Sequence, residues 1–432
     1  MACYENPVGV LVPNVMLPKK GADFYKWAVV ACDQFTSQPE YWEEAERIAA
    51  GCPSALNLIL PEAYLGKPGE AVKIEAIKKN MADYVSGGVV EDIGQGFVLV
   101  ERTAEGKTRN GLILALDLEC YDYKKGSSTL IRATEGTIVE RIPPRLKIRE
   151  GALLELPHIL VLIDDPEKTV VEPLVEHASE LETLYDTDLM GNGGHITGRF
   201  VNKPALIEGV LSALTKLADP ALFEKQYPGK APFLFAMGDG NHSFATAKAY
   251  WEQVKAGLSE TEKEDHPARY CLVEVENVHD AGIVFEPIHR VLFGAGDSEI
   301  EALQAILKEQ NGGCEIASAP SGKGHFLPFI SEVREGGFQV DTPAAQLPVG
   351  TLQNAIDAYL KNHAGAEVDY IHGADVVRDL AKGNALGFLL PAMEKSELVP
   401  TVVYDGALPR KTFSMGEANE KRYYLEARKI QR

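Results

Sequence analysis

The sequence lacks the spacings that mark common metal sites. No two of its six cysteines have CxxC spacing, and none of its ten histidines falls in an HExxH pattern. A zinc or thioredoxin-like site is therefore not indicated, and these spacings support no metal site. The first residues also lack a basic segment followed by a long apolar one. We therefore expect a cytoplasmic protein with reduced thiols.

Positive charge and long apolar runs are also scarce. Lys and Arg total 43 against 63 Asp and Glu, which gives a formal net charge of −20. Such a chain is poorly suited to bind nucleic acid or an anionic membrane surface. The longest apolar runs, such as residues 387–393, are too short to span a bilayer. We expect neither nucleic-acid nor membrane partners, and the oligomeric state stays open.

The order of helical and strand patterns predicts a mixed α/β protein, that is, α+β with mixed sheets. No long regular βαβ series is present, so a purely parallel sheet is not expected. Helices are expected at 39–50, 73–86, 174–185, 205–218, 244–255, 298–309, 350–363 and 373–382. Strands are expected at 9–12, 95–102, 108–118, 159–163, 232–237, 270–278, 283–291, 325–333, 337–340, 367–371 and 385–390, with a final pair near 399–403 and 422–428.

At roughly 150 residues per domain, the length predicts two to three domains or sub-domains. We divide the chain into four regions. Residues 1–230 form an N-terminal α/β region, and residues 231–294 form a strand-turn-helix core. Residues 295–345 form an insertion or sub-domain, and residues 346–432 form a C-terminal α/β region that packs on the core.

The strongest candidate site is the turn Gly238-Asp239-Gly240-Asn241-His242-Ser243 between an expected strand and an expected helix. Two glycines around Asp239 suit a tight turn, and Asn241 or Ser243 can cap the helix. A helix N-terminus attracts phosphate or carboxylate, and His242 can donate to that anion or act in acid/base chemistry. The alternative is a capped connection with a solvated histidine. The spacing matches neither the P-loop nor the dinucleotide-binding pattern.

The second candidate is the segment Arg132 to Thr137, followed by Arg141 and Arg145. Arginine forks suit phosphate and carboxylate ligands, and Glu135 can serve as a general base. The alternative is a surface loop of ion pairs.

Three further segments carry candidate ligand-binding residues. His195 follows a glycine-rich loop at 191–194 that could approach a ligand closely. His289 and Arg290 are neighbours on an expected strand, so only one is expected to face a given site. Arg410 and Lys411 lie in a basic, polar loop near the C-terminus that could close over an anion. The alternatives are a surface loop, a pair at a strand edge and a solvated basic loop.

Four blocks of this sequence resemble those of the DUF1015 family. They are Trp27–Pro39, with the sequence WAVVACDQFTSQP, the segment Gly238–Lys248, the strand Pro287–Arg290 and the loop Leu408–Gly416. The resemblance runs from about residue 8 to residue 430. It implies a ParB/sulfiredoxin-like core with additional sub-domains, because the family is grouped with that superfamily.

The resemblance also implies a role for the 238–243 turn. In sulfiredoxin and free-serine kinase a comparable turn holds nucleotide phosphates, and ParB uses a related turn with CTP. Asp239, Gly240 and His242 match the superfamily pattern Asp-Gly-His-His-Arg, whereas Asn241 replaces its first histidine and Ser243 its arginine. Sulfiredoxin's cysteine is also absent, since position 241 is Asn. The missing arginine could be replaced from another element, by Arg132, Arg141, Arg290 or Arg410.

The leading hypothesis is therefore a small-molecule enzyme that binds a phosphorylated ligand, such as a nucleotide-dependent phosphotransferase using ATP or ADP with Mg²⁺. Glu135 or Asp239 would act as base or Mg²⁺ ligand, and arginines would offset developing negative charge. The alternative is a non-catalytic ligand sensor or partner-binding protein that kept the fold. A ParB-like DNA-associated protein is a third, which the acidic charge disfavours.

Overall fold

The computed structural model describes residues 8–124 and 126–432, which fall into two compact units. The first unit extends to Ile283 and resumes at Gly416–Arg432, and the second is Val284–Met415. This division differs from the four regions expected from the sequence. The reason is strand pairing between distant segments: residues 325–330 of the expected 295–345 insertion pair with strand 385–388, which in turn pairs with strand 289–293, and the last 17 residues return to the first unit.

A ten-stranded mixed sheet organises the first unit, so the expected mixed α/β class is confirmed. The strand order is β11-β12-β5-β6-β14-β10-β13-β8-β7, with β1 also on β6. The pairs β10–β14, β13–β8 and β7–β8 are parallel and the other pairs antiparallel. The bounds are β1 (Val10–Leu11), β5 (Phe97–Ala104), β6 (Lys107–Asp117), β7 (Tyr121–Asp122), β8 (Ile131–Arg132), β10 (Leu160–Ile163), β11 (Glu182–Asp188), β12 (His195–Val201), β13 (Phe235–Asp239) and β14 (Tyr270–Asn277).

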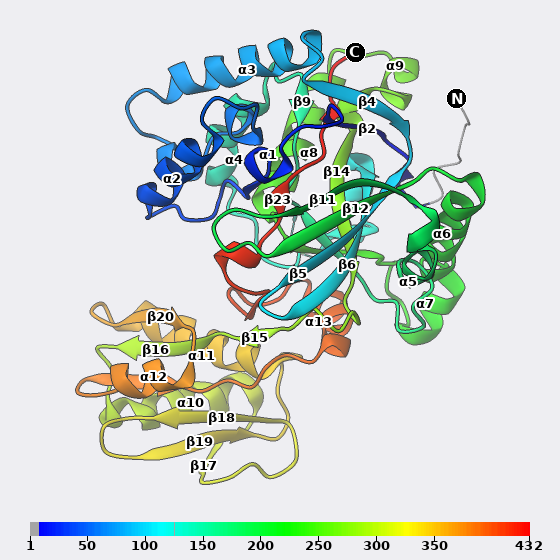
Figure 1. Cartoon of the computed structure of the whole chain (residues 1–432). Helices are drawn as coiled ribbons and strands as arrows, with labels where there is room; N and C mark the ends of the chain where they lie inside the picture. Colours follow the sequence, from blue (N-terminus) through cyan, green and yellow to red (C-terminus); the bar gives the residue numbers. More distant parts are fainter. Residues whose placement is uncertain (1–7, 125) are drawn as a thin grey trace. The chain divides into compact units, whose positions relative to one another are not determined.

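Alternation along the central strands builds a core on each face of this sheet. In β5, Val98 and Val100 join one buried cluster, whereas Phe97 and Leu99 join the other. The first cluster includes α2 (Pro39–Ala49) and α3 (Glu70–Ser86), and the second includes α6 (Pro204–Leu217) and α8 (Asn241–Lys255). Figure 1 shows α2 and α3 on one side of this unit, and α6 with α5 (Glu172–Glu176) and α7 (Pro220–Gln226) on another.

Short strand pairs tie the C-terminal segment to the N-terminal half of the same unit. Strand β23 (Tyr423–Tyr424) pairs with β3 (Val29–Val30), and β24 (Arg428–Lys429) pairs with β9 (Leu154–Glu155). Strand β2 (Asn14–Pro18) pairs with β4 (Val90–Gln95). Helix α4 (Ile142–Arg149) packs along α8. The unit also contains α1 (Phe24–Trp27) and α9 (Glu260–Glu264). Residues from the first, middle and last parts of the sequence are thereby brought to one region.

The second unit is a six-stranded antiparallel sheet with four helices. Its strand order is β17-β19-β18-β21-β16-β20. The strands are β16 (His289–Phe293), β17 (Glu315–Ala317), β18 (His325–Ile330), β19 (Glu335–Val340), β20 (Glu367–Ile371) and β21 (Ala385–Phe388). The helices are α10 (Ile300–Asn311), α11 (Pro348–Asn362), α12 (Ala374–Leu380) and α13 (Leu398–Asp405), and β15 (Glu286–Pro287) pairs with β22 (Phe413–Ser414).

Three local expectations are wrong. Only the start of 174–185 is helical, because residues from Glu182 onward form β11 and pair with β12. Residues 399–403 are helical rather than a strand, and the buried Leu398, Thr401 and Val402 follow helical spacing. The hairpin of β18 and β19 turns at residues 331–334 rather than at 335–336.

In the part of the chain that the structure describes, no helix is both long and apolar enough to cross a membrane. The five cysteines described are unpaired, and Cys3 lies outside the described residues.

Candidate functional site

The predicted turn is a sharp strand-to-helix connection that leaves a helix N-terminus without a side-chain cap. Strand β13 ends at Asp239, Gly240 has φ +78°, and α8 begins at Asn241. The expected capping by Asn241 or Ser243 is wrong, because Gly240 is the N-cap and no side chain caps it. A Cβ at Gly240 would lie 3.0 Å from Ile159 Cγ1, so packing and backbone conformation both require glycine. The first-turn N–H groups are therefore left to backbone, water or ligand.

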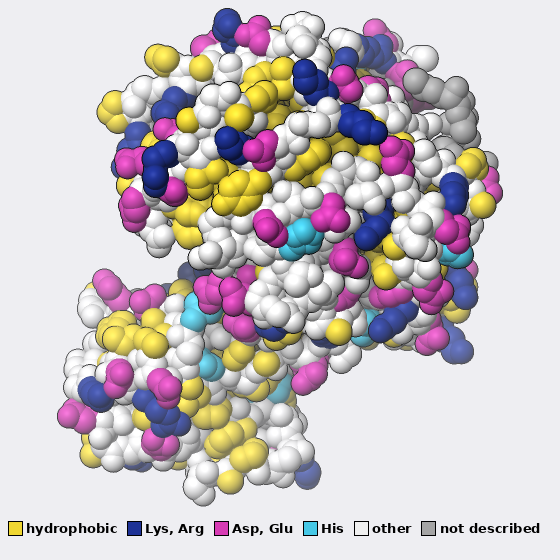
Figure 2. Space-filling model, in the orientation of Figure 1, with side chains coloured by type: hydrophobic (Ala, Val, Ile, Leu, Met, Phe, Trp, Pro, Cys, Tyr) yellow, Lys and Arg dark blue, Asp and Glu magenta, His cyan; other side chains and the backbone are white. Residues whose placement is uncertain are grey.

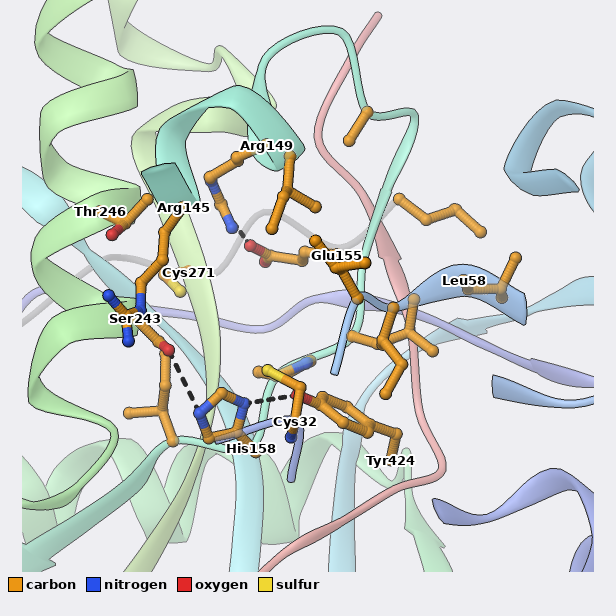
Figure 3. Close-up of a pocket in the computed structure, with 18 of the residues that line it drawn as sticks. Cys32, Leu58, Arg145, Arg149, Glu155, His158, Ser243, Thr246, Cys271 and Tyr424 are labelled. Carbon is orange, nitrogen blue, oxygen red and sulfur yellow. Dashed lines mark hydrogen bonds and ion pairs between the residues drawn. The ribbon is translucent and has the colours of Figure 1, made fainter. Parts of the chain in front are cut away.

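His158 connects this turn to two other segments of the chain. Its Nε2 lies 3.1 Å from Ser243 Oγ on α8, and its Nδ1 lies 2.7 Å from the Tyr424 hydroxyl on β23. Figure 3 shows these two side chains meeting opposite sides of the imidazole ring. The Tyr424 oxygen also accepts from the Cys32 N–H at 3.1 Å.

Asp33 lies beside this ring, with 3.7 Å between Asp33 Oδ2 and His158 Nε2. Burial by itself lowers the pKa of His158, which is 5% exposed, but the Asp33 carboxylate outweighs burial and the pKa is raised. Burial by itself raises the pKa of Asp33, but the neighbouring His158 outweighs burial and the pKa of Asp33 is lowered. The two groups therefore stabilise each other as an ion pair.

Further charges lie around the turn. Lys421 Nζ is 3.3 Å from Asp239 Oδ2. The other carboxylate oxygen of Asp239, Oδ1, accepts from the Gly240 N–H at 2.8 Å. Arg145 on α4 forms an ion pair with Glu62 at 2.5 Å, and both side chains are mostly buried. Charged side chains of both signs therefore lie around the start of α8, most of them in ion pairs.

His242 is held as a neutral imidazole. Burial lowers its pKa first, and the neighbouring Arg145 and Arg141 lower it further against a smaller opposing effect of Asp33. Its Nε2 accepts from the Ile138 N–H at 3.3 Å, so the ring proton of neutral His242 lies on Nδ1. His242 can therefore donate one hydrogen bond to an anion or accept a proton at a later step.

The structure also places the Arg132–Thr137 segment beside the turn. Strand β8 pairs in parallel with β13, and the Thr134 hydroxyl donates to the Met237 carbonyl at 2.5 Å. Glu135 follows directly and is half-buried; its role as a base stays a prediction. Arg132 makes hydrogen bonds within the protein, and its ligand-binding role stays a prediction. It is 5% exposed, and it donates to the carbonyls of Thr129, Ala231 and Pro232.

His195 lies in the first unit but lines a different hollow, one that includes Tyr25, Glu44 and Gly191. Its two ring nitrogens each lie 2.8 Å from a carboxylate, Asp188 at Nδ1 and Asp186 at Nε2. These hydrogen bonds, Asp188 first, raise the pKa of His195. His195 is therefore separate from the 238–243 turn.

The remaining predicted residues belong to the second unit. His289 Nδ1 accepts from the Leu390 N–H at 3.1 Å, and burial lowers its pKa. Arg290 is 0% exposed and donates to Gln353 Oε1 and to the Arg410 carbonyl, and both arginines lie over the Tyr370 ring. Lys411 has φ +55° in the loop after Arg410. These contacts brace a loop of the second unit, and a ligand role for the four residues stays a prediction.

Sequence reasoning did not identify five residues of this site: Asp33, Glu62, His158, Lys421 and Tyr424. A signal existed for Asp33, which lies inside the Trp27–Pro39 block used for the family resemblance. His158 directly precedes the expected strand 159–163, at a position where a side chain can reach a sheet edge. No local pattern marks the other three.

The fold and site together define a mixed α/β protein in which an uncapped helix N-terminus lies beside a buried histidine paired with a half-buried aspartate. The chain matches the family model described as "Protein of unknown function (DUF1015)" over residues 16–362, and it belongs to that family. A search of curated proteins finds no match.

Solved structures with a related arrangement include a free serine kinase in complex with AMP, at 12% identity and a TM-score of 0.37, covering 74% of this chain and 92% of that one. A conserved hypothetical protein from Pyrococcus furiosus matches at 13% identity and a TM-score of 0.33, covering 74% and 95%. SbnI from Staphylococcus aureus matches at 10% identity and a TM-score of 0.34, covering 72% and 82%.

Proposed function

We propose that this protein is a small-molecule enzyme that binds a phosphorylated ligand at the start of α8, acting as a nucleotide-dependent phosphotransferase. The observation that carries the proposal is the convergence of an uncapped helix N-terminus with a neutral His242 and with paired charges from Asp33, His158 and Lys421. Phosphoryl transfer depends mainly on positioning and electrostatics, and such a cluster supplies both.

The N–H groups of the first turn and the helix dipole favour a phosphate group here. The pattern's arginine is replaced by Ser243, and the structure offers cationic groups from other elements in its place. Arg141 and Arg145 both lower the pKa of His242, and Lys421 forms an ion pair with Asp239. Among the replacements expected from the sequence, Arg141 acts on His242 at the turn, whereas Arg132 is engaged by backbone carbonyls.

The oxygen atoms at the turn fit a magnesium–nucleotide ligand. Asn241 Oδ1 is buried without a hydrogen-bond partner among the described residues, and the Asp239 carboxylate lies one residue from Gly240. The described residues contain no group of three or more His, Cys, Asp or Glu that could hold a metal ion. Mg²⁺ bound through phosphates needs only one or two protein oxygens, which Asp239 and Asn241 would supply, and it would offset the phosphate charge.

Three carboxylates are available as the base that accepts the acceptor's proton. Glu135 and Asp239 were expected from the sequence, and Asp33 is added by the structure. Asp33 is placed to act through His158: its carboxylate, 3.7 Å from His158 Nε2, raises the pKa of that imidazole, whereas its own lowered pKa makes it a weak proton acceptor. An imidazole whose pKa is raised by a neighbouring carboxylate is suited to take up a proton.

A second candidate function is a non-catalytic ligand sensor. The observation that favours it is that Asp33 with His158 and Asp239 with Lys421 are already paired inside the protein. Figure 2 shows basic and acidic side chains interspersed over the visible face without an extended basic area, which gives no support to a DNA-binding role.

The test is a thermal-shift screen of ATP, ADP, AMP and phosphate, each with and without Mg²⁺, on wild type, His242→Ala and His177→Ala. His177 is an exposed histidine paired with Glu180 and serves as the matched control. A ligand at 100 times its Kd adds about 2.7 kcal/mol, which raises Tm by several degrees. We expect a nucleotide shift in wild type and His177→Ala that is lost in His242→Ala. A nucleotide shift without turnover favours the sensor, and no shift with any nucleotide refutes the proposal.

A further inference from the structure

A cavity of about 150 Å³ adjoins the proposed site in the first unit. His158, Ser243 and Tyr424 line its polar end, and all three belong to the hydrogen-bonded group at the start of α8. Aliphatic side chains dominate the rest of the wall (Figure 3). They include Leu58, Leu60, Met81, Ile148, Leu154 and Leu156.

The charged residues of the wall are largely satisfied within the protein. Glu155 accepts from Arg149, from Arg428 and from the Leu272 N–H. Burial raises the pKa of the Cys32 thiol far above its ordinary value and has the same effect on Cys271. Both thiols are therefore neutral, and the interior of the cavity is suited to an uncharged, apolar group.

The size of the cavity limits what it can hold. An apolar cavity of about 150 Å³ accommodates a molecule the size of benzene. The aromatic rings among its lining residues are Tyr424 and His158, which hydrogen-bond each other at the polar end. A purine would have to bury ring nitrogens against aliphatic walls, which is costly. Arg149 Nε, buried without a hydrogen-bond partner among the described residues, could serve one acceptor atom on a ligand.

We propose that this cavity is the acceptor pocket, and that the acceptor is a small alcohol with an aliphatic body of about six carbons. The inference rests on the proposed phosphotransferase function. The alcohol's hydroxyl lies at the polar end, near His158. Its oxygen forms a bond to the terminal phosphorus of the nucleotide, and the bond from that phosphorus to the bridging oxygen breaks. The hydroxyl proton passes to the imidazole of His158, which Asp33 supports, and the shortened nucleotide leaves with the bonding electron pair.

The test measures binding and transfer separately, using linear primary alcohols from ethanol to octan-1-ol and the polar alcohol L-serine. Alcohol binding is followed by thermal shift without nucleotide, and transfer by ³¹P NMR with Mg²⁺ and ATP or ADP. The variants are Ile148→Ala, which enlarges the cavity, and Ile48→Ala as the control. Both isoleucines are half-buried and pack against the same core, but Ile48 does not line this cavity.

We expect hexan-1-ol to bind and to be phosphorylated in preference to ethanol and L-serine, with a gain of about tenfold or more over alcohols one methylene too long or too short. Ile148→Ala should move the optimum to a longer chain, whereas Ile48→Ala should leave it unchanged. Three results would overturn the acceptor pocket even if transfer occurs: equal use of all alcohols, preference for L-serine, or an optimal alcohol chain length that is unchanged in Ile148→Ala. Binding of hexan-1-ol with no phosphoryl transfer to any alcohol would overturn the proposed function and with it the acceptor role. Displacement of hexan-1-ol by adenosine would overturn the choice of occupant.

Discussion

Replacing Asp33 by Asn should lower the pKa of His158, which the wild-type protein raises. Asn keeps the shape of the side chain but removes the charge 3.7 Å from His158 Nε2. Burial is the largest influence on His158, and it lowers the pKa. With the Asp33 charge gone, burial should prevail, and the pKa of His158 should fall below its ordinary value instead of lying above it.

The magnitude follows from the distance between the two groups. At 3.7 Å and an effective dielectric constant of about 20, two unit charges interact by about 4 kcal/mol, which is an upper bound on the stabilisation lost. Desolvation of both groups offsets part of it, and the Asp33 side chain is 28% exposed. A loss of 1–3 kcal/mol is therefore the expected order in the pH range where both groups are charged.

The sign of the pH dependence follows from the two pKa directions. The raised pKa of His158 gives stability that is fully present below pH 6.5 and is lost as pH rises through the folded value. The lowered pKa of Asp33 gives stability that is present above pH 3.8 and is lost as pH falls below it. The pair therefore stabilises the protein most between about pH 4 and 6.5, and the Tm difference between wild type and Asp33→Asn should be larger at pH 5.5 than at pH 8.5.

The assays are an NMR titration of ring-labelled histidine and thermal unfolding at the two pH values. Glu208→Gln, at an exposed position on α6, is the control for loss of one negative charge in the same unit. It should leave the His158 titration unchanged. A His158 pKa that stays raised in Asp33→Asn, or a Tm difference that grows toward pH 8.5, would refute the reasoning.

Three further predictions concern other buried polar groups. Tyr424→Phe should cost about 1–3 kcal/mol, measured by thermal unfolding, because His158 Nδ1 and the Cys32 N–H lose their partner. Arg102 is 2% exposed and donates to the carbonyls of Gly193, Asn419 and Lys421. Arg102→Met should therefore lower the free energy of unfolding by about 3 kcal/mol or more and speed proteolysis at residues 189–194. Unchanged cleavage would contradict this prediction. Burial raises the pKa of Glu276 to about 8, so between pH 5 and 8 this carboxyl ionises in the unfolded chain but not in the folded protein, which favours unfolding. The Tm of Glu276→Gln should therefore rise relative to that of wild type over this pH range. A Tm difference independent of pH would argue against a neutral Glu276.

Much of the fold was predictable because its elements carry strong local patterns. The strand at β5 and its partner β6 alternate, and Glu105-Gly106 between them adopts the positive φ angles of a tight hairpin turn. The expected helices 39–50 and 205–218 match α2 and α6 to within a residue or two at each end. The segment 174–185 was misjudged because pairing with β12 overrides its helical preference.

The candidate site was predictable only in part. The strand-turn-helix at Gly238–Ser243 follows from local chemistry, since glycines, a carboxylate and a helix start are all visible in ten residues. The role of Arg132 could not be judged in the same way. Whether a buried arginine meets a ligand or backbone carbonyls depends on residues 231 and 232, about a hundred positions away.

The sequence by itself determined the α/β class, the strong acidic balance, the turn that opens α8 and the absence of familiar metal spacings. These features depend on composition or on neighbours within a few residues. Only the tertiary structure decided that Asp33, His158, Ser243 and Tyr424 meet in one place. Each arrives on a different element, and β23 reaches the site by pairing with β3, nearly 400 residues earlier in the chain. Long-range strand pairing buries these polar groups together, and burial makes their mutual hydrogen bonds and charges strong enough to define a site.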